Sequence, residues 1–152
     1  MSDPTTEERD AALWPAYAET TFRVFTENGE LDILPNTSSQ ELDALLLDHD
    51  VDCWAVITAW NPDSAPTSPE QNAAQNEALR NVVEAEGYAT LRTLGIGADE
   101  RWEPEASFFV LGVDRTRAIE LGAEFGQKAI VWGRARGVAT LIDCGSGEDR
   151  VG

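Results

Sequence analysis

Amide, hydroxyl and carboxyl side chains stand beside the apolar segments of this 152-residue chain, at the points where those segments begin or end. Amides and hydroxyls orient a small polar molecule, and a carboxyl group exchanges a proton with it. The sequence therefore predicts a site for a small polar ligand. Its candidate ligand-binding residues are Thr58, Trp60, Asn61, Asn72, Ser107 and Gln127, and its candidate catalytic acid or base is Glu105.

Glu105 has two interpretations. It follows Pro104 and precedes an apolar run, so partial burial would raise its pKa and suit it to general acid–base catalysis. The alternative is an exposed acid on an acidic surface. Lys128, the only lysine, is either a charge partner for Glu105 or for an anionic ligand, or simply the first residue of a strand.

Asn72 and Asn76 share a helical stripe with Leu79 and Val83, because spacings of four, seven and eleven residues return to one face. These amides therefore point toward the core. One interpretation is that they cap backbone groups of a loop, as most buried amides do. The other is that they help to hold a ligand near the free N–H groups at the start of the helix.

Turn and cap residues mark the ends of the helices and strands that must position these residues. Asn28-Gly29 between residues 20–25 and 30–34 predicts a β-hairpin. Ser38 with Glu41 predicts a capping box that opens a short helix. Ser68 and Pro69 predict the start of a helix over residues 69–86, and Asp114 caps another that stops at Gly126. Strands are expected at residues 51–59, 89–94, 106–113, 128–132 and 138–142.

The resulting fold class is α+β, with a mixed sheet. Its β-α-β-β-α-β order is that of a ferredoxin-like core, preceded by a β-hairpin and a short helix. Right-handed crossovers place the strands 129–132, 53–59, 106–112 and 90–95 side by side, with both helices on one face. The hairpin is expected to extend this sheet or to cover its other face. The predicted domain spans residues 15–144, between a flexible N-terminus (1–14) and a loose tail (145–152).

This topology brings four distant segments to one end of the sheet, so the candidate site residues are expected to form one rim. Other motifs carry less. Asp48-x-Asp50-x-Asp52 lacks the glycine and glutamate of a calcium loop, and the single histidine leaves no zinc pair, so no metal is expected. No phosphate loop or dinucleotide fingerprint is present, and no cofactor is expected.

Charge excludes other classes of partner. The chain has 28 acidic and 11 basic residues and a formal net charge of −17. Nucleic acids and anionic membranes bind basic surfaces, so neither is an expected partner. The acidic N-terminus does not resemble a secretory signal, and the two cysteines form no disulfide framework. A cytoplasmic protein with reduced thiols is expected.

Several blocks of the sequence together resemble a known family. They are Thr20-x-Phe22-x-Val24 with Tyr17, Ile57-Thr58-Ala59-Trp60-Asn61-Pro62, Asn72 with Asn76 and Leu79, Glu105-x-Ser107-Phe108, and Phe125-Gly126-Gln127-x-Ala129-Ile130-x-Trp132. The chain resembles domain of unknown function 3293, a family of small bacterial and archaeal proteins, from Tyr17 to Ile142. The resemblance implies no activity, substrate or cofactor.

Two functions remain open. The first is a ligand-binding or enzymatic site on the rim, with Trp60 as a wall. The second is a non-catalytic interaction module, dimeric through the open face or edge of its sheet, in which the motif residues only build the loop between residues 60 and 68. An exposed aromatic patch around Trp102 or Trp132 without a cleft would favour the second.

The acidic composition generates a prediction about salt. Carboxylates in place of surface lysines suit a salty cytoplasm, because salt screens their mutual repulsion. The melting temperature should therefore rise as salt increases from about 0.05 to 2 M. Thermal unfolding followed by circular dichroism measures this, and a constant melting temperature over that range would contradict adaptation to salt.

Overall fold

The computed structural model describes residues 14–61, 67–99 and 103–150. The predicted flexible N-terminus up to residue 13, the loop positions 62–66 and Trp102 lie outside these ranges. The strands are β1 (Thr21–Thr26), β2 (Gly29–Ile33), β3 (Cys53–Ile57), β4 (Ala89–Ile96), β5 (Glu105–Leu111), β6 (Ala129–Arg134), β7 (Thr140–Asp143) and β8 (Asp149–Arg150). The helices are α2 (Gln40–Asp48), α3 (Pro69–Ala85) and α4 (Arg115–Glu124), and residues 14–18 are also helical.

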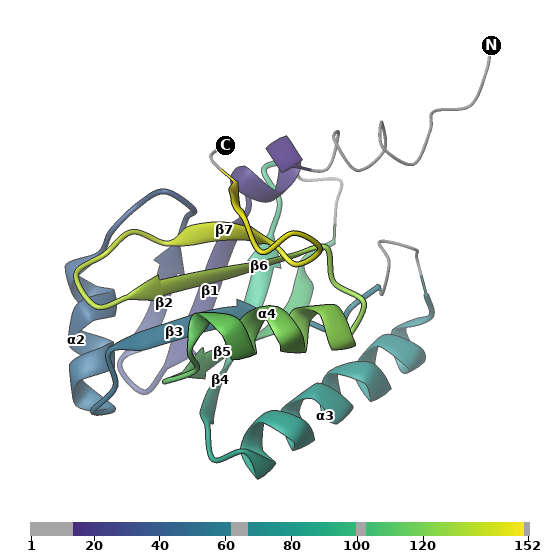
Figure 1. Cartoon of the computed structure of the whole chain (residues 1–152), viewed down its shortest axis with the longest axis horizontal. Coiled ribbons are helices and arrows are strands. Elements are labelled where there is room, and N and C mark those ends of the chain that lie inside the picture. Colours follow the sequence, from purple (N-terminus) through teal and green to yellow (C-terminus); the bar gives the residue numbers. More distant parts are fainter. Residues whose placement is uncertain (1–13, 62–66, 100–102, 151–152) are drawn as a thin grey trace.

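The strands form one curled sheet in the order β2-β1-β4-β5-β3-β6-β7-β8 (Figure 1). The α+β class is confirmed, but the mixed sheet is wrong because every neighbouring pair is antiparallel. The helical crossover from β3 leads to β4 with β5 between them, so these two parallel strands are not neighbours. The strands β6, β3, β5 and β4 are neighbours in the predicted order. The sheet is nevertheless larger than a ferredoxin-like sheet, because β1 adds to it beside β4 and β7 adds to it beside β6.

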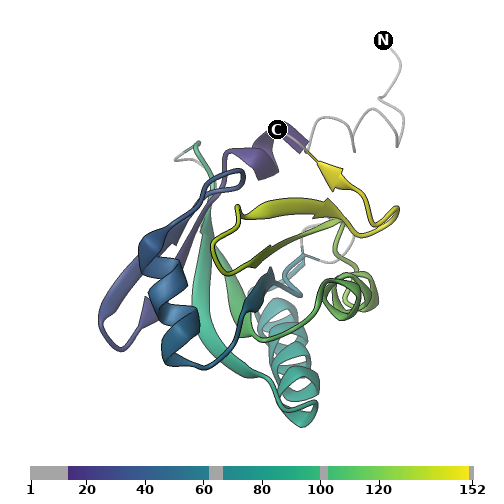
Figure 2. The same cartoon turned by 60° about the vertical axis from the view of Figure 1, so that its left-hand side comes forward.

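The sheet separates two apolar cores because side chains alternate between its faces. On one face, Ala55 and Ile57 of β3 pack with residues of α3 and α4. On the other face, Trp54 and Val56 pack with α2 and with the curled ends of the sheet. Figure 2 shows α2 inside the curl, on the side opposite α3 and α4. The hairpin β1–β2 therefore extends the sheet, and α2 covers the second face.

Cap residues explain where the helices begin. The hydroxyls of Ser68 and Ser39 accept hydrogen bonds from the backbone N–H groups of Gln71 and Leu42, each at 3.1 Å. The Asp114 carboxylate accepts one from Arg117 N–H at 2.8 Å. Ser38 as the first cap was therefore wrong by one residue, since two adjacent serines offer the same local chemistry.

The C-terminal segment up to Arg150 contacts the rest of the fold. Asp143 accepts a hydrogen bond from the N–H of Gly145, and the chain turns back so that β8 pairs with β7. Arg115 of α4 donates to the Gly147 carbonyl and to Asp149, which ties this turn to the helix. Gly145 and Gly147 suggested a flexible segment from the sequence, and in the structure they allow a tight turn. Among the described helices, none is both long enough and apolar enough for a membrane span.

Gly133 allows the closest packing in the second core. A methyl group at this position would lie 2.7 Å from Cζ2 of Trp54, which is itself stacked on Phe109. Gly133→Ala should lower the free energy of unfolding by about 1–3 kcal/mol, because the tryptophan must shift. Gly95→Ala is the matched control in β4, where the added carbon meets Phe22 at an ordinary 3.5 Å. Urea unfolding of both variants tests this, and equal stabilities would refute the close packing.

Candidate functional site

Two asparagines fix the chain where it leaves β3. Asn61 has a left-handed backbone with φ of 46°, and its N–H donates to Oδ1 of Asn72 at 2.8 Å. In return, Nδ2 of Asn72 donates to Oδ1 of Asn61 at 2.9 Å. Thr67 joins this pair, since its N–H donates to Asn61 at 3.1 Å and its hydroxyl donates to Asn72. The pair therefore holds both ends of the loop that joins β3 to α3.

Asn76, one turn further along α3, connects two strands. Its Oδ1 accepts the N–H of Ala59 at 2.8 Å, and its Nδ2 donates to the carbonyl of Ala106 at 3.0 Å. The Thr58 hydroxyl donates to that same carbonyl at 2.7 Å. These groups follow β3 and open β5, where the ladder between the two strands has ended. The buried amides thus cap loop backbone, which is the first of the two interpretations drawn from their spacing.

Glu105 lies against Asn61, as the predicted convergence requires. Its side chain is half-buried and accepts a hydrogen bond from the Asn61 side chain. Burial raises the pKa of Glu105 above its ordinary value, and the hydrogen bond from Asn61 offsets part of that rise. Within residues 14–61, 67–99 and 103–150, no cation, Lys128 included, contributes to the pKa of Glu105.

Gln127 reaches the same region from the segment between α4 and β6. Its Nε2 donates to the carbonyls of Trp60 and Phe125, each at 3.2 Å. Trp60 is half-buried, and its own N–H donates to the Thr58 hydroxyl at 3.0 Å. Gln127 therefore positions the backbone at Trp60, while its Oε1 has no hydrogen bond to a described residue.

Ser107 is the candidate that the structure places differently. It is buried at 4% exposure, and its hydroxyl contacts the Glu105 carbonyl at 3.4 Å. It stands opposite the buried Thr93 of β4, on the sheet face of Phe109 and the second core. Ser107 is therefore buried close to the backbone of Glu105.

The structure thus brings Thr58, Trp60, Asn61, Asn72, Glu105 and Gln127 together. We name the pair formed by Asn61 and Glu105 the rim pair. Sequence reasoning missed Thr67, whose backbone and hydroxyl both bind the rim asparagines. Its signal was its place directly before the helix cap Ser68, where a short polar side chain commonly turns back onto the preceding loop.

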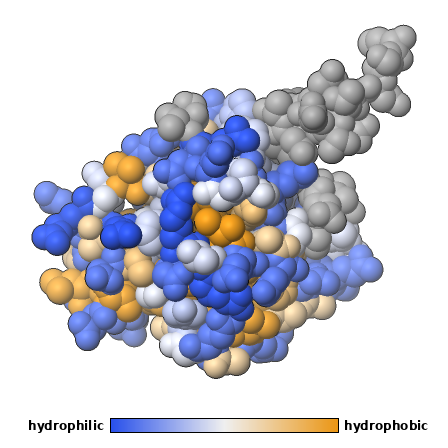
Figure 3. Space-filling view, in the orientation of Figure 1, coloured by the Kyte–Doolittle hydropathy of each residue, from blue (hydrophilic) through white to orange (hydrophobic). Residues whose placement is uncertain are grey.

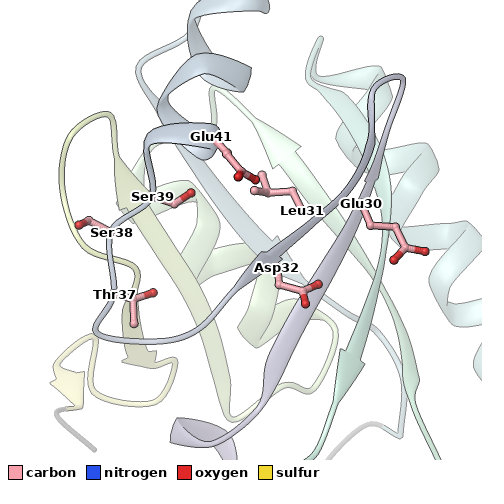
Figure 4. A pocket seen from close by; sticks show the side chains of 7 residues that line it. All are labelled: Glu30, Leu31, Asp32, Thr37, Ser38, Ser39 and Glu41. Atoms are coloured by element: carbon pink, nitrogen blue, oxygen red, sulfur yellow. The ribbon is translucent and has the colours of Figure 1, made fainter.

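Two cavities lie away from the rim pair. One, of about 480 Å³, is an open depression between β2 and the start of α2. Figure 4 shows its carboxylates, Glu30, Asp32 and Glu41, spread along the depression instead of converging on one point. The described residues contain no group of three histidine, cysteine or acidic side chains arranged to hold a metal ion.

The hydrogen bonds of Asn76 generate a prediction. Asn76→Ala should lower the free energy of unfolding by about 2–5 kcal/mol, because it leaves the buried N–H of Ala59 and the carbonyl of Ala106 without that partner. Asn81→Ala is the matched control, since Asn81 is exposed on the same helix. Chemical denaturation should show a change within about 0.5 kcal/mol for the control. Equal losses in both variants would mean that the amide does not join the strands.

Comparison with known proteins adds the family. No curated protein and no solved structure matches the chain. A family model described as "Protein of unknown function (DUF3293)" matches residues 57–130, a stretch that includes the rim pair, Asn72, Asn76 and Gln127. The resemblance drawn from the sequence blocks is confirmed over residues 57–130, where the chain is similar to the DUF3293 family.

Proposed function

We propose that the rim pair is the polar centre of a site for a small polar ligand, in which Glu105 holds or releases a proton. The observation that supports this proposal most strongly is the state of Glu105. Its carboxyl is half-buried, its pKa is raised by burial, and no cation of the described residues contributes to that pKa. A buried carboxylate without a cation costs stability, so a functional use is a reason to keep one.

The surrounding residues have supporting roles in this proposal. Asn72 holds Asn61 in its left-handed conformation, so the Asn61 amide stays aimed at the carboxyl group. Thr58, Asn76 and Gln127 hold the adjoining backbone, and Ser107 lies beneath Glu105. Trp60 supplies an apolar wall. Such fixed polar groups beside an aromatic side chain are typical of ligand sites.

The proposal extends to the fold and to the setting of the protein. We infer that the segment from β3 to β6 is a ferredoxin-like core within one domain, enlarged by the strands on either side. The rim pair then lies where β3 ends and β5 begins, at the end of the core where α3 starts. A cytoplasmic setting rich in salt agrees with the net charge of −17.

Glu105→Gln separates a functional carboxyl group from a structural one. A raised pKa means that ionised Glu105 costs stability above its folded-state pKa, and that this cost vanishes below the unfolded pKa of about 4.3. At pH 7 the variant should therefore unfold at the same or a higher denaturant concentration than the wild type. As the pH falls below about 4.3, the two should converge. Urea unfolding as a function of pH measures both effects.

The same variant tests binding. A thermal-shift screen with small polar acids, amides, amines and sugars should find compounds that stabilise the wild type and fail to stabilise Glu105→Gln. Glu103→Gln is the matched control, because Glu103 is exposed and only two residues away. Loss of folding in Glu105→Gln, or equal stabilisation of all three proteins by every compound, would count against the proposal.

A second candidate function is a non-catalytic interaction module, a homodimer in particular. One observation favours it: the side-chain amides of Asn72 and Asn76 form hydrogen bonds within the chain, as expected if they only build the loop. The proposed aromatic patch does not support it, because Trp132 is only 8% exposed and Trp102 lies outside the described residues. The face shown in Figure 3 is mainly hydrophilic, with apolar residues in small separate groups. Sedimentation analysis that finds a stable dimer would favour this second function.

A further inference from the structure

A second cavity, of about 470 Å³, lies at the end of β3 opposite the rim pair. Its walls come from the start of β3 with the residue before it, from the start of α4 and from the end of β6. The volume lies within the range of about 300–1,000 Å³ that small-molecule sites occupy. Of its lining residues only Trp132 belongs to a sequence block of the family resemblance, and none belongs to the rim pair.

The floor of this cavity is apolar and fixed. Trp132 is buried, and its indole N–H donates to the carbonyl of Val113 at 2.9 Å. The Cys53 thiol donates to the same carbonyl at 3.2 Å. Burial and the nearby carboxylates of Asp52 and Asp114 raise the pKa of the Cys53 thiol, which therefore stays neutral at physiological pH. The floor can contact an apolar group but offers no nucleophile.

The edge of the cavity carries two guanidinium groups and two carboxylates, which differ in their partners. Arg115 is engaged by Asp149, and the Asp114 carboxylate caps α4. Arg134, in contrast, stands over the Trp132 ring at 5.5 Å. Within residues 14–61, 67–99 and 103–150, neither its guanidinium nor the Asp52 carboxylate has an ion-pair partner. Two opposite charges thus border one cavity without pairing with each other.

We propose that this cavity binds a small zwitterion of the amino-acid type with an apolar side chain. Its carboxylate would meet Arg134, its ammonium group would meet Asp52, and its side chain would lie on Trp132 and Cys53. A free anion is repelled by the net charge of −17, whereas a free cation finds carboxylates over the whole surface. A zwitterion is neutral, and the two unpaired charges distinguish its ends.

Three related probes test the charges separately: phenylalanine, phenylalanine amide, which lacks the carboxylate, and N-acetylphenylalanine, which lacks the ammonium group. Each is titrated to about 20 mM into the isotopically labelled full chain and followed by NMR. Phenylalanine should give saturable shifts at the amides of Cys53 and Thr116 and at the Trp132 indole. Each analogue should bind about fivefold more weakly, the value of one exposed ion pair of about 1 kcal/mol.

Variants assign each charge. Arg134→Gln should bind phenylalanine and its amide equally, and Asp52→Asn should bind phenylalanine and its N-acetyl form equally. Arg136→Gln, an exposed arginine outside the cavity, should keep the wild-type preference. Unchanged resonances elsewhere show that each variant is folded. The proposal is overturned if phenylalanine gives no saturable shift, or if the wild type binds all three probes equally.

Discussion

The structure depends on the way α3 completes the hydrogen bonding of β3 and β5 after their ladder ends. Beyond Ile57, two strands and a loop diverge, and their N–H and carbonyl groups need partners inside the protein. Asn76 supplies a donor and an acceptor to these strands, and Asn72 supplies the same to Asn61. Because both amides stand on the stripe that carries Leu79 and Val83, burial of the helix and closure of the loop occur together.

This arrangement gives the rim its character. The hydrogen-bonded loop end holds the Asn61 side chain against Glu105, whose carboxyl group is half-buried and has no cation beside it in the part of the chain that the structure describes. The apolar packing around this carboxylate offsets the free-energy cost of burying it. The asparagines are thus both structural and positioning residues, since the bonds that close the loop also aim the amide of the rim pair.

The two ends of β3 differ in their chemistry for a related reason. At the end near Asn61, polar side chains form hydrogen bonds with the backbone of the loop that joins β3 to α3. At the other end, β3 and β6 are joined to α4 through Val113, whose single carbonyl accepts both Trp132 and Cys53. At the edge of the cavity, Arg134 and Asp52 form no ion pair with a described residue. One sheet therefore presents a carboxyl–amide pair at one end and a cavity of mixed charge at the other.

Local chemistry by itself determined much of this protein. Ser68 with Pro69, Asp114 and Gly126 marked helix ends that the structure reproduces, and apolar segments marked the strands, because caps and side-chain patterns act over a few residues. The approach of Asn61 to Glu105 followed from the order of the elements. Tertiary structure alone decided that Ser107 and Trp132 are buried, that α2 enters the curl of the sheet, and that β8 closes the tail. A period of two tells which residues share a face but not what covers that face, since covering is set by contacts between segments far apart in the chain.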